Sequence, residues 1–137
     1  MGVVLDTSFL IDHERGRRVL PDDEELAVAA ITAAELLHGV HRADAARRPA
    51  REAFVEGILA SVPVIPFTLP VVRVHARLWA ELAASRRTLG AHDLMVAATA
   101  LALDWPLVTL DRKGFAGIPG LRLRQLDERQ RPGGRRS

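Results

Sequence analysis

The sequence predicts an α/β domain with a mostly parallel sheet and helices on both faces. Short continuous apolar runs, typical of buried parallel strands, alternate along the chain with longer segments of helical periodicity. The length of 137 residues fits one domain, and the 48% hydrophobic and 26% charged content is ordinary for a globular protein. The fold class follows from these patterns, whereas the order of the strands does not.

The first half of the chain contains six predicted elements. Thr32 and Glu35 have the spacing of a capping box, so we expect a helix to open at Thr32, with Ile31 as the staple residue before it. Pro63 and Pro66 favour an edge position for the strand that contains them. The expected strands cover residues 3–5, 26–31 and 62–66, and the expected helices cover residues 9–18, 32–42 and 47–60.

The second half continues the alternation. A strongly amphipathic helix is expected over residues 70–87, and an almost wholly apolar, buried helix over residues 92–103. A buried strand over residues 107–110 and an edge strand over residues 121–123 complete the domain. Trp79 and Trp105 are expected to be packing residues. Residues 1–126 are the predicted domain, and residues 127–137 are expected to be a basic, disordered tail.

Composition excludes several classes of protein. No cysteine is present, which rules out a thiolate nucleophile, a cysteine-ligated zinc and an iron–sulfur cluster. No glycine-rich nucleotide-binding motif is present either. The N-terminal segment lacks a basic leader, and the longest apolar run is far shorter than the roughly 20 residues of a membrane span, so we expect a cytoplasmic protein.

Four acidic residues map to one rim of the predicted sheet. Asp6 and Asp111 directly follow predicted strands, while Glu35 and Asp93 lie in the first turns of predicted helices. The carboxyl ends of parallel strands and the amino ends of the following helices share one edge, which is the usual ligand site of such folds. Acids spread over more than one hundred residues of sequence are therefore expected to converge.

Each acid also has a purely structural interpretation. Asp6 and Asp111 fit turns, Glu35 fits the capping box, and Asp93 fits a helix N-terminus. Four clustered carboxylates, however, repel one another unless a cation neutralises them, and Mg²⁺ or Mn²⁺ prefers such oxygen ligands. A cation of this kind typically binds phosphate groups and activates a water molecule that attacks them, so the acids predict hydrolysis of a phosphate ester.

At these positions the sequence resembles the PIN-domain family, in particular the VapC toxins of bacterial type II toxin–antitoxin pairs. The matching segments are VVLDTSFLID, ITAAELLHGV, LGAHDLMVAATAL and LVTLDRKGF, in this order along the chain. The resemblance implies a three-layer α/β/α sandwich and a Mg²⁺- or Mn²⁺-dependent endoribonuclease that leaves 5′-phosphate and 3′-hydroxyl ends. It also implies a homodimer and a VapB-type antitoxin, whose arginine would compete with the cation for the carboxylates.

The resemblance assigns roles to the matching residues. Asp6 and Asp93 are the implied metal ligands, and Glu35 completes the acidic cluster and orients the attacking water. Asp111 is the implied fourth acid, with Ser8 and Thr109 as supporting hydroxyls. Many relatives carry Asn at the position of Asp111 and an acid a few residues later, where this chain has Lys113 and Gly114. Asp111 therefore either ligates a second metal or only holds its loop.

Several other residues have two interpretations. Four basic residues near the rim either contact RNA phosphates or form a solvated basic edge, and the sequence favours neither interpretation. They are Arg86, Arg87, Arg112 and Lys113. His38 and His41 are expected to be exposed rather than metal ligands, and His92 gains only weak support from its place beside Asp93. The aromatic content of 4% makes base-stacking platforms unexpected.

Other functions compete with the toxin ribonuclease. A PIN-fold nuclease that acts on nucleic-acid structures or RNA precursors is one alternative, and a non-catalytic PIN-like binding module is another. A receiver-type signalling domain fits poorly, because Asp22 and Asp23 lie in a polar break rather than at a strand end.

Overall fold

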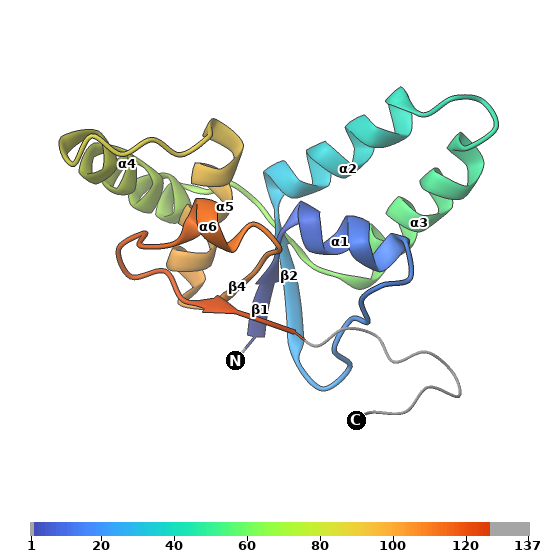
Figure 1. The fold of residues 1–137 in the computed structure, drawn as a ribbon, viewed down its shortest axis with the longest axis horizontal. Coiled ribbons are helices and arrows are strands. Elements are labelled where there is room, and N and C mark those ends of the chain that lie inside the picture. The colour runs from blue at the N-terminus through green and yellow to red at the C-terminus, as the bar shows by residue number, and fades with distance from the viewer. Residues whose placement is uncertain (1, 127–137) are drawn as a thin grey trace.

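The computed structural model describes residues 2–126, which form a five-stranded parallel sheet and six helices (Figure 1). The strands lie in the order β3-β2-β1-β4-β5, and every neighbouring pair is parallel. The elements are β1 (Gly2–Leu5), α1 (Thr7–Glu14), β2 (Glu25–Ala29), α2 (Ala30–Arg42), α3 (Arg48–Ser61), β3 (Val64–Ile65), α4 (Leu69–Ala84), α5 (Ala91–Leu103), β4 (Leu107–Val108), α6 (Arg112–Phe115) and β5 (Leu123–Arg124). The predicted α/β class and the edge positions of β3 and β5 are confirmed.

Helices cover both faces of the sheet, as the predicted three-layer sandwich requires (Figure 1). The fully buried β1 sends alternate side chains to opposite faces. Val3 and Leu5 belong to one core with side chains from α1, α2 and α3, whereas Val4 belongs to a second core with α4, α5 and Phe115 of α6. The central strand thus joins two separate apolar layers.

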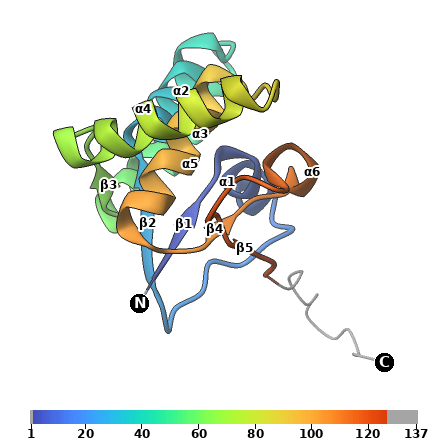
Figure 2. The same cartoon turned by 90° about the vertical axis from the view of Figure 1, so that its left-hand side faces the viewer.

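The α5 helix lies directly against the sheet, and α4 packs on its outer side (Figure 2). Residues 96–100 of α5 are all buried, which confirms the prediction of an apolar helix surrounded by protein. Its first turn, which begins at Ala91, reaches the rim where the strands end. The buried body of α5 therefore fixes the position of Asp93.

The predicted capping box is wrong. Strand β2 leads directly into α2, whose N-cap is Ala29, so Thr32 already lies inside the helix and Glu35 lies in its second turn. Thr32 is fully buried, and its hydroxyl finds no hydrogen-bond partner among residues 2–126. Glu35 consequently does not serve the helix end, and its carboxylate is left for other contacts.

The packing role predicted for Trp79 is also wrong, because this residue is 62% exposed. It follows the buried Leu78 by one residue, and that step rotates it by about 100° out of the packed face of α4. Trp105, in contrast, packs against the second core as expected. Helix α4 ends at Ala84, before the predicted residue 87, and Arg86 then adopts a left-handed φ of 56°.

The predicted tail, residues 127–137, lies outside the described residues. Across residues 2–126, no helix combines the length and the apolar character needed to cross a membrane.

Candidate active site

Asp6 lies where β1 ends and α1 begins, next to the end of β4. Its backbone N–H donates to the carbonyl of Val108 at 2.9 Å, which continues the pairing of the two strands. The residue is only 6% exposed. Its Oδ2 atom accepts hydrogen bonds from the Thr109 hydroxyl at 2.7 Å and the Ser8 hydroxyl at 3.2 Å. These contacts place both predicted supporting hydroxyls at the predicted metal ligand.

The same two hydroxyls shape the loop after β4. The backbone N–H of Leu110 donates to Ser8 Oγ at 3.0 Å, and that of Asp111 donates to Thr109 Oγ1 at 3.0 Å. Because these N–H groups bind side chains rather than a neighbouring strand, β4 ends at Val108 instead of at the predicted residue 110. The loop is thereby fixed beside Asp6.

Glu35 reaches the rim from α2 and is held by two residues of other elements. Thr7 Oγ1 donates to Glu35 Oε1 at 2.7 Å, and His92 Nδ1 lies 3.3 Å from Glu35 Oε2. The sequence analysis missed Thr7, although it stands between Asp6 and Ser8 in the same motif. Its position at the start of α1, directly after Asp6, could have predicted a third hydroxyl at the site.

Asp111 caps the short helix α6. Its Oδ1 atom accepts a hydrogen bond from the backbone N–H of Gly114 at 3.1 Å. A Cβ atom at Gly114 would overlap the Asp111 carboxylate, so glycine permits this close approach. Asp111 is exposed, unlike Asp6. The described contacts thus agree with the loop-holding interpretation of Asp111, while its charge still acts on Asp93.

The pKa shifts show that the four acids share one electrostatic environment. Burial raises the pKa of Asp93, and the negative charges of Asp6, Asp111 and Glu35 raise it further. Burial is also the main reason why the pKa of Asp6 is raised, opposed by the hydrogen bonds from Thr109 and Ser8. Asp93 therefore lies within electrostatic reach of the three other acids, which disfavours its ionised form.

The donor set fits a hard divalent cation. Asp6 and Asp93 offer carboxylate oxygens, and the raised pKa of Asp93 marks a place where a positive charge would relieve repulsion. Within residues 2–126, no three His, Asp or Glu side chains already stand close enough to enclose an ion. Mg²⁺ does not need such an enclosure, because it commonly keeps several waters and takes one or two protein carboxylates.

The four predicted phosphate-binding residues differ in how they are held. Arg87 is half-buried and donates to the carbonyl of Ala116, which fixes its guanidinium near the loop after α6. Arg86 is exposed in the connection after α4, while Arg112 and Lys113 are exposed at the start of α6. Their role in binding phosphate remains a prediction.

Neither His38 nor His41 approaches the acid cluster in any described contact, and both are exposed on α2 as predicted. His92 is better placed than its sequence position suggested, because its ring contacts Glu35.

Comparison with known proteins identifies the family. A sequence model of the PIN domain matches residues 3–121, so the chain belongs to the PIN-domain family. Ribonuclease VapC of Rickettsia bellii is 34% identical over 125 residues, which cover 88% of this chain and 93% of the relative. The chain is accordingly a nuclease, as the acid cluster at the rim indicates.

Solved structures agree with this assignment. VapBC2 from Rickettsia felis, bound to a DNA fragment from the promoter, superimposes with a TM-score of 0.81 at 25% identity, covering 93% of this chain and 100% of that one. VapBC-5 from Mycobacterium tuberculosis, a member of the VapBC family of toxin-antitoxin systems, gives a TM-score of 0.74 at 29% identity, with coverage of 92% and 100%. The predicted three-layer PIN fold is thus confirmed.

Proposed function

We propose that this protein is a divalent-cation-dependent endoribonuclease that acts as the toxin of a VapBC-type toxin–antitoxin pair. The observation that carries the proposal is the arrangement of acids at the rim: the buried Asp6 carboxylate is held by Thr109 and Ser8, and Glu35 is held by Thr7, the residue next to Asp6. Burial and the negative charges of Asp6, Asp111 and Glu35 also raise the pKa of Asp93. Such a field repels an RNA phosphodiester unless a cation is present, so substrate binding and cation binding are coupled. The VapC relative supports RNA as the substrate.

Asp6 and Asp93 are the residues that would hold Mg²⁺ or Mn²⁺. When bound, the cation supplies charge neutralisation at the scissile phosphate and a lower pKa for a nucleophilic water. The hydrogen bonds from Thr109 and Ser8 keep the Asp6 carboxylate in one orientation, since both donate to its Oδ2 atom. Asp6 therefore needs little reorganisation to act as a ligand.

Glu35 orients the attacking water and accepts its proton. Its two oxygens have different partners: Thr7 occupies Oε1, and the His92 ring lies beside Oε2. The Thr7 hydrogen bond fixes the carboxylate, so that Oε2, beside the His92 ring, would be the oxygen that accepts the proton. Attack of this water on phosphorus would break the bond to the 3′-oxygen, which would take a proton from solvent to become the 3′-hydroxyl, and would leave a 5′-phosphate on the other product.

The partners follow from the same proposal. A VapB-type antitoxin would cover the acid cluster, and an arginine of that antitoxin would pair with the carboxylates in place of the cation. The similarity to the two VapBC structures supports such a partner. A homodimer in the cytoplasm completes the proposed biological form.

The direct test is incubation of the antitoxin-free protein with total cellular RNA in Mg²⁺, Mn²⁺ or EDTA. We expect discrete cuts with either cation, no cuts in EDTA, and loss of the cuts in Asp93→Asn. Asp104→Asn is the matched control, because it makes the same chemical change at the opposite end of α5 and should cleave normally.

Three results would contradict the proposal. Cleavage of RNA by Asp93→Asn at the wild-type rate would exclude the acid cluster as the catalytic site. RNA binding without cleavage in any cation, by protein shown to be folded, would instead assign the chain to the non-catalytic binding module. Preference for structured DNA over every RNA tested would favour the structure-specific nuclease.

A further inference from the structure

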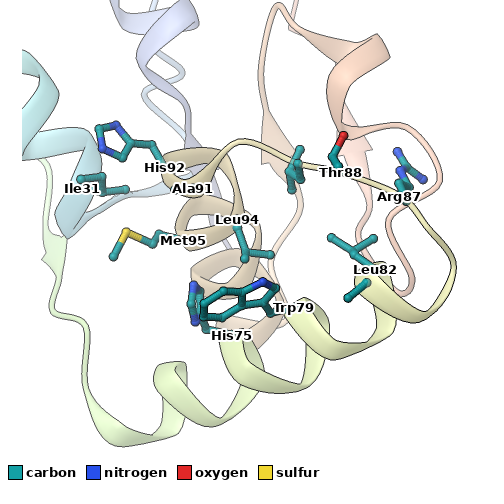
Figure 3. Close-up of a pocket in the computed structure, with 12 residues that line it drawn as sticks. Ile31, His75, Trp79, Leu82, Arg87, Thr88, Ala91, His92, Leu94 and Met95 are labelled. Carbon is teal, nitrogen blue, oxygen red and sulfur yellow. The ribbon is translucent and has the colours of Figure 1, made fainter.

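An apolar cavity of about 610 Å³ opens between α4 and α5, next to the acid cluster (Figure 3). This volume lies within the range of pockets that bind small organic groups, and such pockets combine apolar walls with a few polar atoms. One wall comes from α4 and includes Trp79 and Leu82, while the other comes from α5 and includes Leu94 and Met95. The catalytic roles proposed above use none of these four side chains.

Aromatic rings form one side of the cavity. The His75 ring packs against Trp79 at a centroid distance of 5.7 Å and against Phe67 at 5.3 Å. Trp79 is nevertheless 62% exposed, so the fold does not need this large ring for its core. An exposed indole held by a neighbouring ring is a surface on which a planar group can stack.

One residue of the cavity wall contacts the catalytic site. His92 lines the cavity, and its Nδ1 atom lies 3.3 Å from Oε2 of Glu35. Ile31, which lines the same end, lies one helical turn before Glu35 on α2. A nucleotide next to the one being cleaved would therefore pass from the acids into the cavity.

Arg87 and Thr88 lie at one end of the cavity and His92 at the other, while His75 lies beside Trp79 between them (Figure 3). Thr88 and Arg87 line the end formed by the connection after α4 (Figure 3). The Arg87 guanidinium donates to the carbonyl of Ala116. Arg87 offers a positive charge at one end, and the acids that would hold the cation lie beside the other end. This arrangement suits a nucleotide whose planar base enters the cavity while the phosphates on its two sides bind at the two ends.

We propose that this cavity binds one unstacked nucleobase of the RNA, adjacent to the scissile phosphate, by stacking it on Trp79. The inference rests on the proposed function, because it assumes a nucleic-acid substrate at the acid cluster. It replaces the expectation, based on the low aromatic content, that the protein lacks a stacking surface. Selection of the cleavage site would then depend on an unpaired base beside the cut.

Intrinsic fluorescence tests the base contact without any cleavage. The chain has two tryptophans, so Trp105→Phe leaves Trp79 as the sole indole. We expect the four 5′-mononucleotides, titrated in the presence of Mg²⁺, to quench Trp79 to different saturating extents, while inorganic phosphate at equal concentration does not. Equal responses to phosphate and to nucleotides, or no response to either, would overturn the proposal.

Cleavage kinetics provide the second measurement. Trp79→Ala should raise KM for a defined RNA about tenfold or more, in line with the loss of one base–aromatic stack, and Trp79→Phe should restore most of the affinity. Leu69→Ala is the matched control, since Leu69 is 59% exposed on the same helix but does not line the cavity.

Equal KM values for Trp79→Ala and Leu69→Ala would contradict base binding. Loss of self-association or of antitoxin binding in Trp79→Ala, without a change in KM, would assign this face to a protein partner instead. Failure of the ribonuclease proposal can be distinguished from failure of the base-binding proposal. In the first case the wild type would cleave no RNA, while nucleotides could still quench Trp79.

Discussion

The Thr109 hydroxyl donates a 2.7 Å hydrogen bond to the Asp6 carboxylate, although 103 residues separate the two in sequence. The bond joins the ends of β1 and β4, which are neighbours in the sheet. It also links the cation site to the next loop, because the same hydroxyl oxygen accepts from the backbone N–H of Asp111. One side chain thus orients a proposed metal ligand and the loop that carries the fourth acid.

Thr109→Val should impair both stability and cation binding. Valine matches the shape of threonine but leaves the buried Asp6 carboxylate and the Asp111 N–H each without one partner, at a cost of about 1–3 kcal/mol in the free energy of unfolding. Urea denaturation and Mn²⁺ titration measure the two effects. Thr109→Ser is the control, because it keeps the hydroxyl. Wild-type Mn²⁺ affinity in Thr109→Val would contradict this role, and so would an equal loss of Mn²⁺ affinity in both variants.

Asp93→Asn should separate stability from activity. Removing one charge from four repelling acids should raise the Tm of the cation-free protein at neutral pH, since those charges raise the pKa of Asp93. The same variant should lose RNA cleavage and the Tm increase that Mg²⁺ gives the wild type. Differential scanning calorimetry with Mg²⁺ or EDTA checks both points, and a lower Tm in EDTA would argue against repulsion at this site.

Stability without cation should depend on pH through Asp6. Its pKa is raised in the folded state by burial, so between the unfolded and folded pKa values the native protein binds more protons than the unfolded chain. The contribution to stability is complete below the unfolded value of about 3.9 and is lost as pH rises through the folded value.

Urea denaturation in EDTA at a series of pH values from about 4 to 7 measures this effect. Relative to Asp6→Asn, which cannot titrate there, the wild type should lose stability as the pH rises. Parallel curves for the two proteins would show that burial does not perturb Asp6.

Substitutions of Asp111 should distinguish its charge from its capping role. Asn caps helices as well as Asp does, so Asp111→Asn should keep the bond from the Gly114 N–H and retain more activity than Asp93→Asn. Asp111→Ala loses the cap as well and should cost about 1 kcal/mol in stability. Complete loss of cleavage in Asp111→Asn, with normal stability, would instead support a metal-ligand role for Asp111.

The sequence predicted the site better than it predicted the contacts within it. Asp6 could be placed because the apolar run before it reveals where β1 ends, and parallel strands end at one rim. The run before Asp111 extends past the end of β4 at Val108, so it placed Asp111 only approximately. The contact between Thr7 and Glu35 could not be predicted, because it depends on how α1 and α2 lie across the sheet. The exposure of Trp79 was missed for a similar reason, since a helical pattern does not resolve residues at the margin of its apolar face.

The central claim is that Asp6 and Asp93 together bind the divalent cation on which cleavage depends. The most direct measurement is isothermal titration calorimetry of Mn²⁺ into the wild type, Asp6→Asn, Asp93→Asn and the control Asp104→Asn, all free of antitoxin. We predict saturable binding by the wild type and Asp104→Asn, and its loss in both site variants. Undiminished Mn²⁺ binding by Asp93→Asn would contradict the claim.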